Sequence, residues 1–373
     1  MPSADPFPVV ATVELIGDRW IWRIDCGPDG EAIDFQSGPV DDVRDASRDM
    51  NDSLRALVDV VKGWSDLSEV ARAEHVNALK QRGRRLAGAF FDGRQDEFAR
   101  YLGLLTSPVL TQYTYGRSEQ PLFEHCLLND GNGEFFLGER CICRYRVINA
   151  KRADLRKHYE AAQRAGPRLV GYAEDSSLDS ACRMHNRPDP ARSEEEISIL
   201  TDLAGGKDRL SVLDALTESL SDAELEVLRN WIAEKNHVLH FNCHTDQSLE
   251  FPRLRLRSGA KIGILEMTHP VRAADFRGTL VFLNASSSVI GRSSLKTSIA
   301  EFFRQRRASC ILCTTGPIED RFATRLARVF YDHLGDGMNV VTALLAARQK
   351  LLEEGHPMAL QYTFIGNDNH RLV

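Results

Sequence analysis

Short apolar runs alternate with longer amphipathic segments through the second half of the chain. Residues 238–241, 280–283 and 310–313 each have the length of a buried strand, and each is followed by small or polar residues. Segments with helical periodicity lie between these runs, for example residues 293–306. Apolar strands that alternate with helices predict a largely parallel sheet with helices on both faces. We therefore expect an α/β fold.

The length of 373 residues is enough for two domains. A polar segment that ends at Gly166 and Pro167 indicates the boundary, which gives domains 1–165 and 166–373. In the first domain, residues 9–24 predict two strands around a turn at Gly17 and Asp18. Apolar residues recur at helical spacing in residues 40–104, which predicts helices there.

Composition and net charge indicate which kinds of partner the chain is suited to bind. The chain is 43% hydrophobic and 27% charged, with a net charge of −6, which does not favour nucleic acid or an anionic membrane as a direct partner. Two arginine clusters, residues 82–85 and 304–307, are expected at solvated helix ends. No signal peptide or membrane span is visible, and the cysteines lie mostly in apolar segments, so we expect a cytoplasmic protein with reduced cysteines and no cofactor.

The strongest candidate for chemistry is the pair of strand ends at His244 and Ser286. Carboxyl ends of neighbouring parallel strands meet at one edge of a sheet, where ligands bind. A histidine can take and return a proton near neutral pH, and it activates a hydroxyl or thiol nucleophile. Backbone N–H groups at Ser286 and just after His244, at Thr245, are placed to bind an oxyanion. The pattern predicts a histidine–nucleophile dyad that cuts peptide bonds.

Other reactive residues nearby have structural explanations. Cys243 alternates to the opposite face of the strand from His244, so we expect a core residue. His240 shares the face of His244 but lies deeper, as a core histidine. Cys310 and Cys313 have the spacing of a metal knuckle, but no second pair matches them, so no metal site is predicted.

Several motifs resemble the CHAT branch of the caspase-like cysteine peptidases. That family's His-x-x-Cys-His-Gly and Leu-x-Ala-Cys strand ends correspond here to residues 240–245 and 283–286. Its Phe-Tyr-x-x-Leu and Ala-Leu-x-x-Ala-Arg helices are similar to residues 330–334 and 343–348. Weaker similarity to its amino-terminal motifs Pro-Trp-Glu and Phe-Leu-Gly lies in residues 122–124 and 136–138.

The resemblance implies a caspase-like peptidase domain preceded by a degenerate, non-catalytic caspase-like lobe. It implies a cysteine endopeptidase with a Cys-His dyad, acting on a partner protein in bacterial antiviral defence or cell death, beside gasdermin-like or CRISPR-associated proteins. Two positions depart from the pattern: Thr245 replaces the family's Gly, and Ser286 replaces its nucleophilic Cys.

Ser286 leaves three interpretations open. The first is a substitution that inactivates the peptidase, and the second is a natural pseudo-peptidase that serves as an interaction scaffold. The third is a working serine variant. A serine hydrolase on an unrelated sheet is disfavoured, because no Gly-x-Ser-x-Gly elbow surrounds Ser286.

Acidic residues follow two of the predicted strands. Glu174 and Asp175 come after the first strand of the second domain, and Asp246 comes shortly after His244. In caspase-like folds the loop after that first strand helps to form the substrate pocket, so these residues are candidates for a pocket that favours a basic or polar side chain. The alternative is that they are solvated loop residues.

Overall fold

The computed structural model describes residues 10–25, 32–61, 64, 67–102, 109–114, 122–147, 168–174, 190–213, 216, 217, 219–234, 236–246, 253–256, 259–268, 275–285, 299–316, 318–367 and 370–372. The chain divides into two compact units. Unit 1 comprises Met1–Ala153 and Arg348–Leu360, and unit 2 comprises Asp154–Ala347 and Gln361–Val373. The predicted boundary near residue 165 lies outside the described residues and stays a prediction, but the return of residues 348–360 to unit 1 is a feature that the sequence did not reveal.

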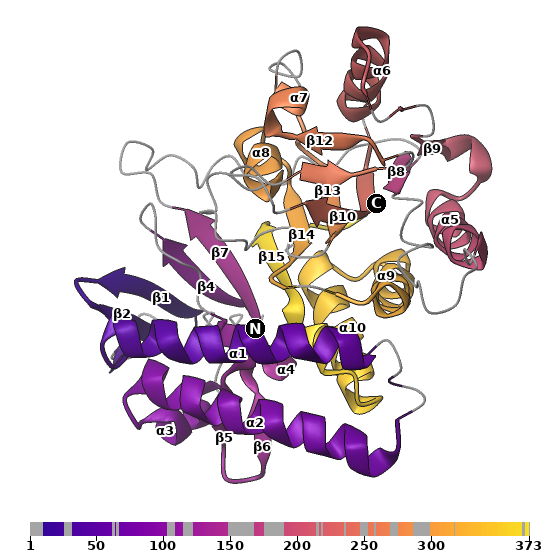
Figure 1. Cartoon of the computed structure of the whole chain (residues 1–373). Coiled ribbons are helices and arrows are strands. Elements are labelled where there is room, and N and C mark those ends of the chain that lie inside the picture. Colours follow the sequence, from indigo (N-terminus) through magenta and orange to yellow (C-terminus); the bar gives the residue numbers. More distant parts are fainter. Residues whose placement is uncertain are drawn as a thin grey trace, which may run out of the picture. The chain divides into compact units, whose positions relative to one another are not determined.

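Unit 1 combines a five-stranded part of a sheet with long helices (Figure 1). Its strands run in the spatial order β7-β4-β1-β2-β3, in which β7, β4 and β1 are parallel and β1, β2 and β3 are antiparallel. Its elements are β1 (Val10–Ile16), β2 (Arg19–Asp25), β3 (Ile33–Gln36), α1 (Val40–Val61), α2 (Glu69–Phe91), α3 (Gln95–Leu102), β4 (Val109–Thr114), η2 (Phe123–His125), β5 (Leu127–Asn129), β6 (Glu134–Phe136), α4 (Leu137–Arg140) and β7 (Ile142–Val147).

The turn predicted at Gly17 and Asp18 is confirmed as the connection between β1 and β2, and Gly17 adopts φ +65°. Trp22 on β2 is fully buried and contacts the rings of Phe90, Phe91 and Phe123, at centroid distances of 5.9, 4.7 and 4.6 Å. Aromatic clusters of this kind bury a large apolar area and prefer edge-to-face geometry. This cluster is the core of unit 1.

A buried arginine joins distant segments of unit 1. Arg348 is 0% exposed, its guanidinium lies 3.5 Å from Oε1 of Glu124, and it donates to the carbonyls of Gly138 and Cys141 at 3.2 Å. Glu124, Gly138 and Arg348 each belong to a motif on which the family resemblance depends. A buried guanidinium requires such partners, because an unpaired buried charge is very costly.

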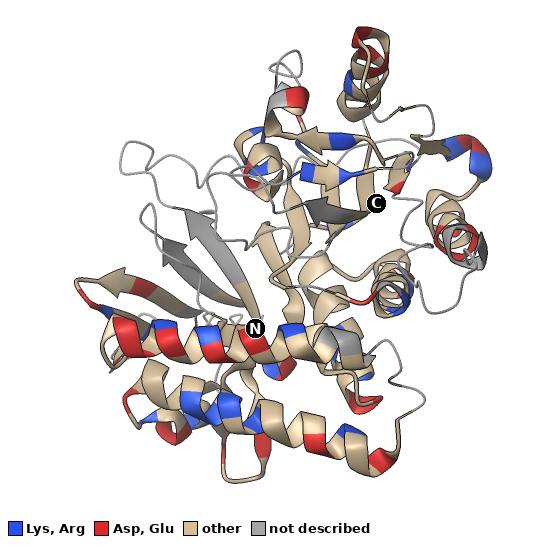
Figure 2. Ribbon diagram, in the orientation of Figure 1, with Lys and Arg blue, Asp and Glu red and all other residues tan. Residues whose placement is uncertain are grey.

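Helices α1 and α2 lie side by side, and both carry many charged side chains (Figure 2). The first arginine cluster lies inside α2 rather than at its end, which corrects the sequence-based placement. Arg84 forms a bidentate pair with Glu134 at 2.7 Å, and Arg85 pairs with Asp49 of α1. These arginines are therefore engaged by carboxylates of the same unit.

Unit 2 contains a largely parallel sheet, as predicted. The strands lie in the order β9-β8-β10-β13-β14-β15; the first five are parallel and β15 is antiparallel. The elements are β8 (Val170–Glu174), α5 (Pro190–Ala204), η5 (Lys207–Arg209), β9 (Leu210–Val212), α6 (Asp222–Ala233), β10 (Val238–Asp246), β11 (Arg253–Arg255), β12 (Lys261–Gly263), α7 (Ile264–Thr268), β13 (Leu280–Ala285), α8 (Ile299–Gln305), β14 (Cys310–Thr314), α9 (Asp320–Gly335), α10 (Val340–Glu353), η9 (Pro357–Gln361) and β15 (Tyr362–Gly366).

Helices cover both faces of this sheet, and the alternation of β10 shows which face each helix takes. His240 and Asn242 contact side chains of α9 and α5. Phe241, which points the opposite way, contacts Trp231 of α6 and Phe303 of α8 at 5.7 Å. Helix α10 begins in unit 2, and its residues from Arg348 onward belong to unit 1.

Local sequence signals predict three helix starts: Ser193 as a cap, Pro317 in a first turn and a capping box that begins at Ser221. Two of these starts differ in the structure. Ser193 does not cap α5, because the helix already begins at Pro190, a residue suited to a first helical turn. Pro317 does not open α9, which begins at Asp320 with Glu319 as its cap. The predicted capping box at Ser221 is confirmed. Among the described helices, none is long and apolar enough to cross a membrane.

Candidate functional site

The two strands that carry the predicted dyad are neighbours. β10 and β13 pair in parallel from Val238 with Leu280 to Cys243 with Ala285. His244 and Ser286 are the next residues along the two strands. Ser286 lies outside the described residues, and only the backbone of His244 is described. The register brings the two strand ends together, and the contact between the two side chains stays a prediction.

β10 does not stop at His244, as the sequence suggested, but continues to Asp246. The extension arises because β11 pairs with it in antiparallel fashion, His244 opposite Arg255 and Asp246 opposite Arg253. Thr245 is therefore strand backbone. Asp175 lies outside the described residues.

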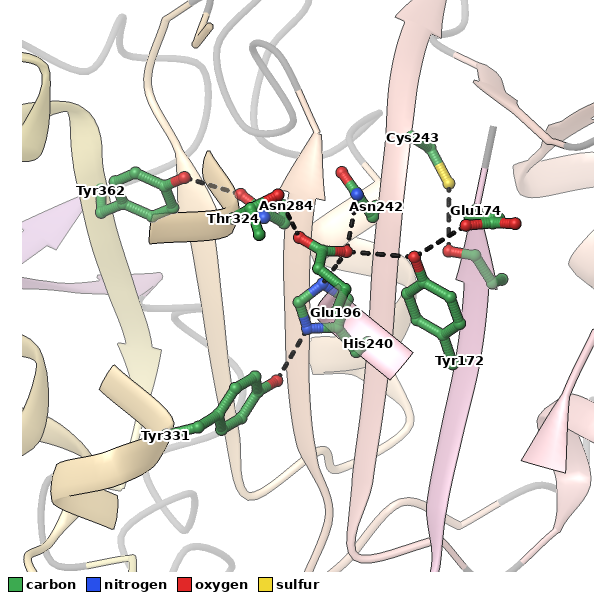
Figure 3. A network of polar contacts seen from close by, with 11 residues as sticks. Tyr172, Glu174, Glu196, His240, Asn242, Cys243, Asn284, Thr324, Tyr331 and Tyr362 are labelled. Carbon is green, nitrogen blue, oxygen red and sulfur yellow. Dashed lines mark hydrogen bonds and ion pairs between the residues drawn. The ribbon is translucent and has the colours of Figure 1, made fainter. Parts of the chain in front are cut away.

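A row of polar residues crosses the sheet just before these strand ends. Glu174 of β8, Asn242 of β10 and Asn284 of β13 are register partners. Thr314 of β14 pairs with Tyr362 of β15, and the Tyr362 hydroxyl donates to Oδ1 of Asn284 at 2.6 Å (Figure 3). Register partners share a face, and along β10 this row lies two residues before His244.

Glu196 of α5 is the centre of the network that surrounds this row. Its Oε2 accepts hydrogen bonds from Nδ2 of Asn242 at 2.6 Å and contacts the Tyr172 hydroxyl at 3.1 Å, while its Oε1 accepts from the Thr324 hydroxyl at 3.0 Å (Figure 3). The three contacting side chains come from β10, β8 and α9. One carboxyl group thus connects two strands and two helices directly beneath the predicted site.

His240 is a core histidine, as predicted. It is 0% exposed, and its Nδ1 lies 2.8 Å from the Tyr331 hydroxyl. Nε2 is 3.7 Å from Oε2 of Glu196, too far for a hydrogen bond. Burial lowers the pKa of His240 to about 3, so the ring is neutral at physiological pH.

Burial also changes the acid–base behaviour of Glu196. Desolvation is the main cause that raises its pKa to about 7, while the hydrogen bonds with Thr324, Tyr172 and Asn242 act to lower it. The negative charge of Glu174 acts in the same direction as desolvation. Perturbed carboxyl groups of this kind are enriched at functional sites.

The cysteines near the site behave as core residues. Cys243 is 2% exposed, with its Sγ 3.6 Å from the carbonyl oxygen of Ala173. Cys310 and Cys313 are fully buried in β14. In the described parts of the chain, no group of three or more His, Cys, Asp or Glu side chains is arranged to hold a metal.

Sequence reasoning missed Glu196 and Tyr172. A signal for Glu196 was present, since it shares a helical face with Ile199, Leu200 and Leu203, all of which are buried. A carboxylate on such a face needs polar partners, and those that the structure shows come from β8, β10 and α9, far from Glu196 in sequence. Only the fold supplies them.

Comparisons with known proteins agree with this architecture. Residues 123–365 match the model of the family described as the CHAT domain, and no curated protein matches the chain. A chain of the Saccharomyces cerevisiae separase–securin complex aligns with a TM-score of 0.56 at 8% identity, covering 96% of this chain and 30% of that chain. This chain therefore spans less than a third of that one.

Two further solved structures align more loosely. The Arg-specific cysteine proteinase gingipain R of Porphyromonas gingivalis has a TM-score of 0.44 at 10% identity, with 79% of this chain and 68% of that chain covered. The Drosophila initiator caspase Dronc has a TM-score of 0.31 at 9% identity, with 54% and 80% covered.

Proposed function

This chain belongs to the CHAT-domain family, with a caspase-like fold, and we propose that it is a cysteine endopeptidase with serine at its nucleophile position. The observation that carries the proposal is the parallel register of β10 and β13. It pairs Cys243 with Ala285, the residues that immediately precede His244 and Ser286.

The proposed mechanism starts from a cysteine at position 286. His244 takes the thiol proton, and the thiolate attacks the scissile carbonyl carbon. Backbone N–H groups of Thr245 and residue 286 hold the resulting oxyanion. The C–N bond then breaks as His244 gives the proton to the leaving amine. Water hydrolyses the thioester, which releases the second product and restores the thiol.

We propose Glu174 as the acidic wall of the substrate pocket, and Asp175 and Asp246 as further contributors. Glu174 stands at the carboxyl end of β8, in register with Asn242, and is 4% exposed. A carboxylate in such a poorly solvated position favours a cationic partner, since the Coulomb interaction is less screened there. The proposed substrate is therefore a protein cut after a basic or polar side chain.

The experiment restores the thiol. Ser286→Cys should generate new amino-termini in a proteome-derived peptide library, with basic residues enriched before the cut, and Ser286→Cys combined with His244→Ala should not. Glu174→Gln in the Ser286→Cys background should reduce the preference for basic residues. A library that Ser286→Cys leaves intact would contradict the peptidase proposal.

Ser286 itself favours a second candidate, a natural pseudo-peptidase that binds partner proteins without cutting them. A serine hydroxyl is a much weaker nucleophile than a thiolate in a site set for sulfur. Gasdermin-like and CRISPR-associated proteins are the proposed partners in a defence or cell-death pathway, under either function. Co-purification of the Ser286 protein with such proteins, followed by incubation with the Ser286→Cys form, separates binding alone from cleavage.

A further inference from the structure

The hydroxyl of Tyr172 lies between two buried carboxyl groups (Figure 3). It is 2.9 Å from Oε2 of Glu174 and 3.1 Å from Oε2 of Glu196, and these residues are 4% and 1% exposed. A phenol has one proton, so it can donate to only one of them. The other contact is a hydrogen bond only if that carboxyl group is protonated and donates to the phenol oxygen. With one of the two carboxyl groups protonated, both contacts are hydrogen bonds and all three side chains are satisfied.

Glu196 is the better holder of this proton. Among the side chains that the structure describes, the titratable groups that face it are Tyr172 and Glu174 from β8, His240 from β10 and Tyr331 from α9. None of these is a cation at neutral pH, since His240 is uncharged. Burial raises the pKa of Glu196 to about 7, which supports the same assignment.

We propose that Glu196 is a positioning residue of the site: as a neutral acid it donates to the hydroxyl of Tyr172, which donates to Glu174 and holds that carboxylate in place for a cationic substrate side chain. This inference rests on the proposed function. It adds Glu196 of α5, which does not contact the substrate but positions the Glu174 carboxylate of the pocket.

Loss of the Glu196 proton breaks this relay. Two carboxylates then compete for the single proton of Tyr172, and Glu174 is held less firmly. Selectivity for a cationic side chain should therefore fall as pH rises through the ionisation of Glu196. Glutamine at position 196 presents an N–H donor to Tyr172 at every pH once the Asn242 amide turns its oxygen, instead of its N–H, toward position 196. Glu196→Gln should therefore remove this pH dependence.

The first test needs no catalysis and uses the Ser286 protein. Infrared difference spectra between pH 6 and pH 9 should contain the carbonyl stretch of a protonated carboxylic acid. Glu196→Gln should remove this band. Glu195→Gln is the matched control and should keep it, because Glu195 is 44% exposed and pairs with Arg328 at 2.8 Å. A band that survives Glu196→Gln, or no band in the parent, overturns the proposal.

The second test uses the Ser286→Cys background. The ratio of kcat/KM for an Arg peptide to that for its Gln counterpart should fall roughly fivefold between pH 6 and pH 8.5 and stay constant in Glu196→Gln. Glu196→Gln should keep kcat/KM at pH 6 within about threefold of the parent, and a tenfold loss there would overturn the neutral-acid assignment. Absence of any cleavage would contradict the proposed peptidase function but not the protonation of Glu196, because the infrared test measures that protonation without catalysis.

Discussion

Tyr362 and Asn284 are joined by a 2.6 Å hydrogen bond between β15 and β13, although 78 residues separate them in sequence. Both are buried, and Asn284 stands two residues before the proposed nucleophile. In the described part of the chain, Nδ2 of Asn284 has no hydrogen-bond partner. The Tyr362 hydroxyl is therefore an important determinant of how this side chain is oriented.

Tyr362→Phe should lower the free energy of unfolding by about 1–2 kcal/mol, because it leaves a buried amide oxygen without its donor. In the Ser286→Cys background it should also lower kcat. Tyr331→Phe is the control, since it removes a hydroxyl from His240 rather than from Asn284. Urea denaturation and peptide kinetics measure the two effects. Equal losses of kcat in both variants would contradict a specific role for Tyr362.

Glu196 and His240 should give opposite pH dependences of stability. Folding raises the pKa of Glu196 from about 4.3 to about 7, so between these values the folded state holds a proton that the unfolded state lacks. Stability from this group falls as pH rises. Folding lowers the pKa of His240 from about 6.5 to about 3, so stability from His240 is lost as pH falls. The two contributions largely cancel near pH 5–6.

Glu196→Gln should remove the contribution of Glu196 to the pH dependence of stability and leave that of His240. The difference in unfolding free energy between parent and variant should change by about 2–3 kcal/mol from pH 4.5 to pH 7.5, with the parent favoured at the acidic end. Urea titrations at several pH values measure it, with Glu195→Gln as the exposed control. Parallel curves for parent and Glu196→Gln would show that Glu196 is ionised in the folded protein.

The buried ion pair of unit 1 should be strongly coupled to stability. Arg348→Met leaves Glu124 buried without its cation and should cost about 3–5 kcal/mol. Arg328→Met removes the exposed pair with Glu195 and should cost less than about 1 kcal/mol. Thermal and chemical denaturation measure both. A small effect of Arg348→Met would indicate that solvent reaches Glu124.

Gly366 should not tolerate a side chain. It has φ +125°, and an added Cβ would lie 2.4 Å from the backbone oxygen of Ser309, which cannot move independently of β14. Gly366→Ala should therefore cost more than about 2 kcal/mol. Gly335→Ala, at the end of α9, meets no atom within 4 Å and should be neutral or slightly stabilising. Differential scanning calorimetry compares the two.

Local patterns predicted the elements well where periodicity was strong. The runs that became β10, β13 and β14, and the capping box at Ser221, could be recognised from adjacent residues alone. The start of α5 at Pro190 could not, because its first turn is polar and resembles a loop.

Site residues that depend on long-range contacts could not be predicted from the sequence. His244 was recognisable because a strand end and a family motif coincide there. Glu196 depends on partners from β8, β10 and α9, which no local window contains. The extension of β10 to Asp246 likewise depends on pairing with β11. Sequence reasoning found the residue proposed for chemistry and missed the residues that support it.

Helix α10 gives its first turns to unit 2 and its last turns, from Arg348, to unit 1. A fragment that begins at residue 166 would keep Arg348 but lose Glu124, Gly138 and Cys141, which contact its guanidinium. Loss of residues 1–165 would leave residues 348–360 without the rest of their unit, in a segment that runs directly into β15.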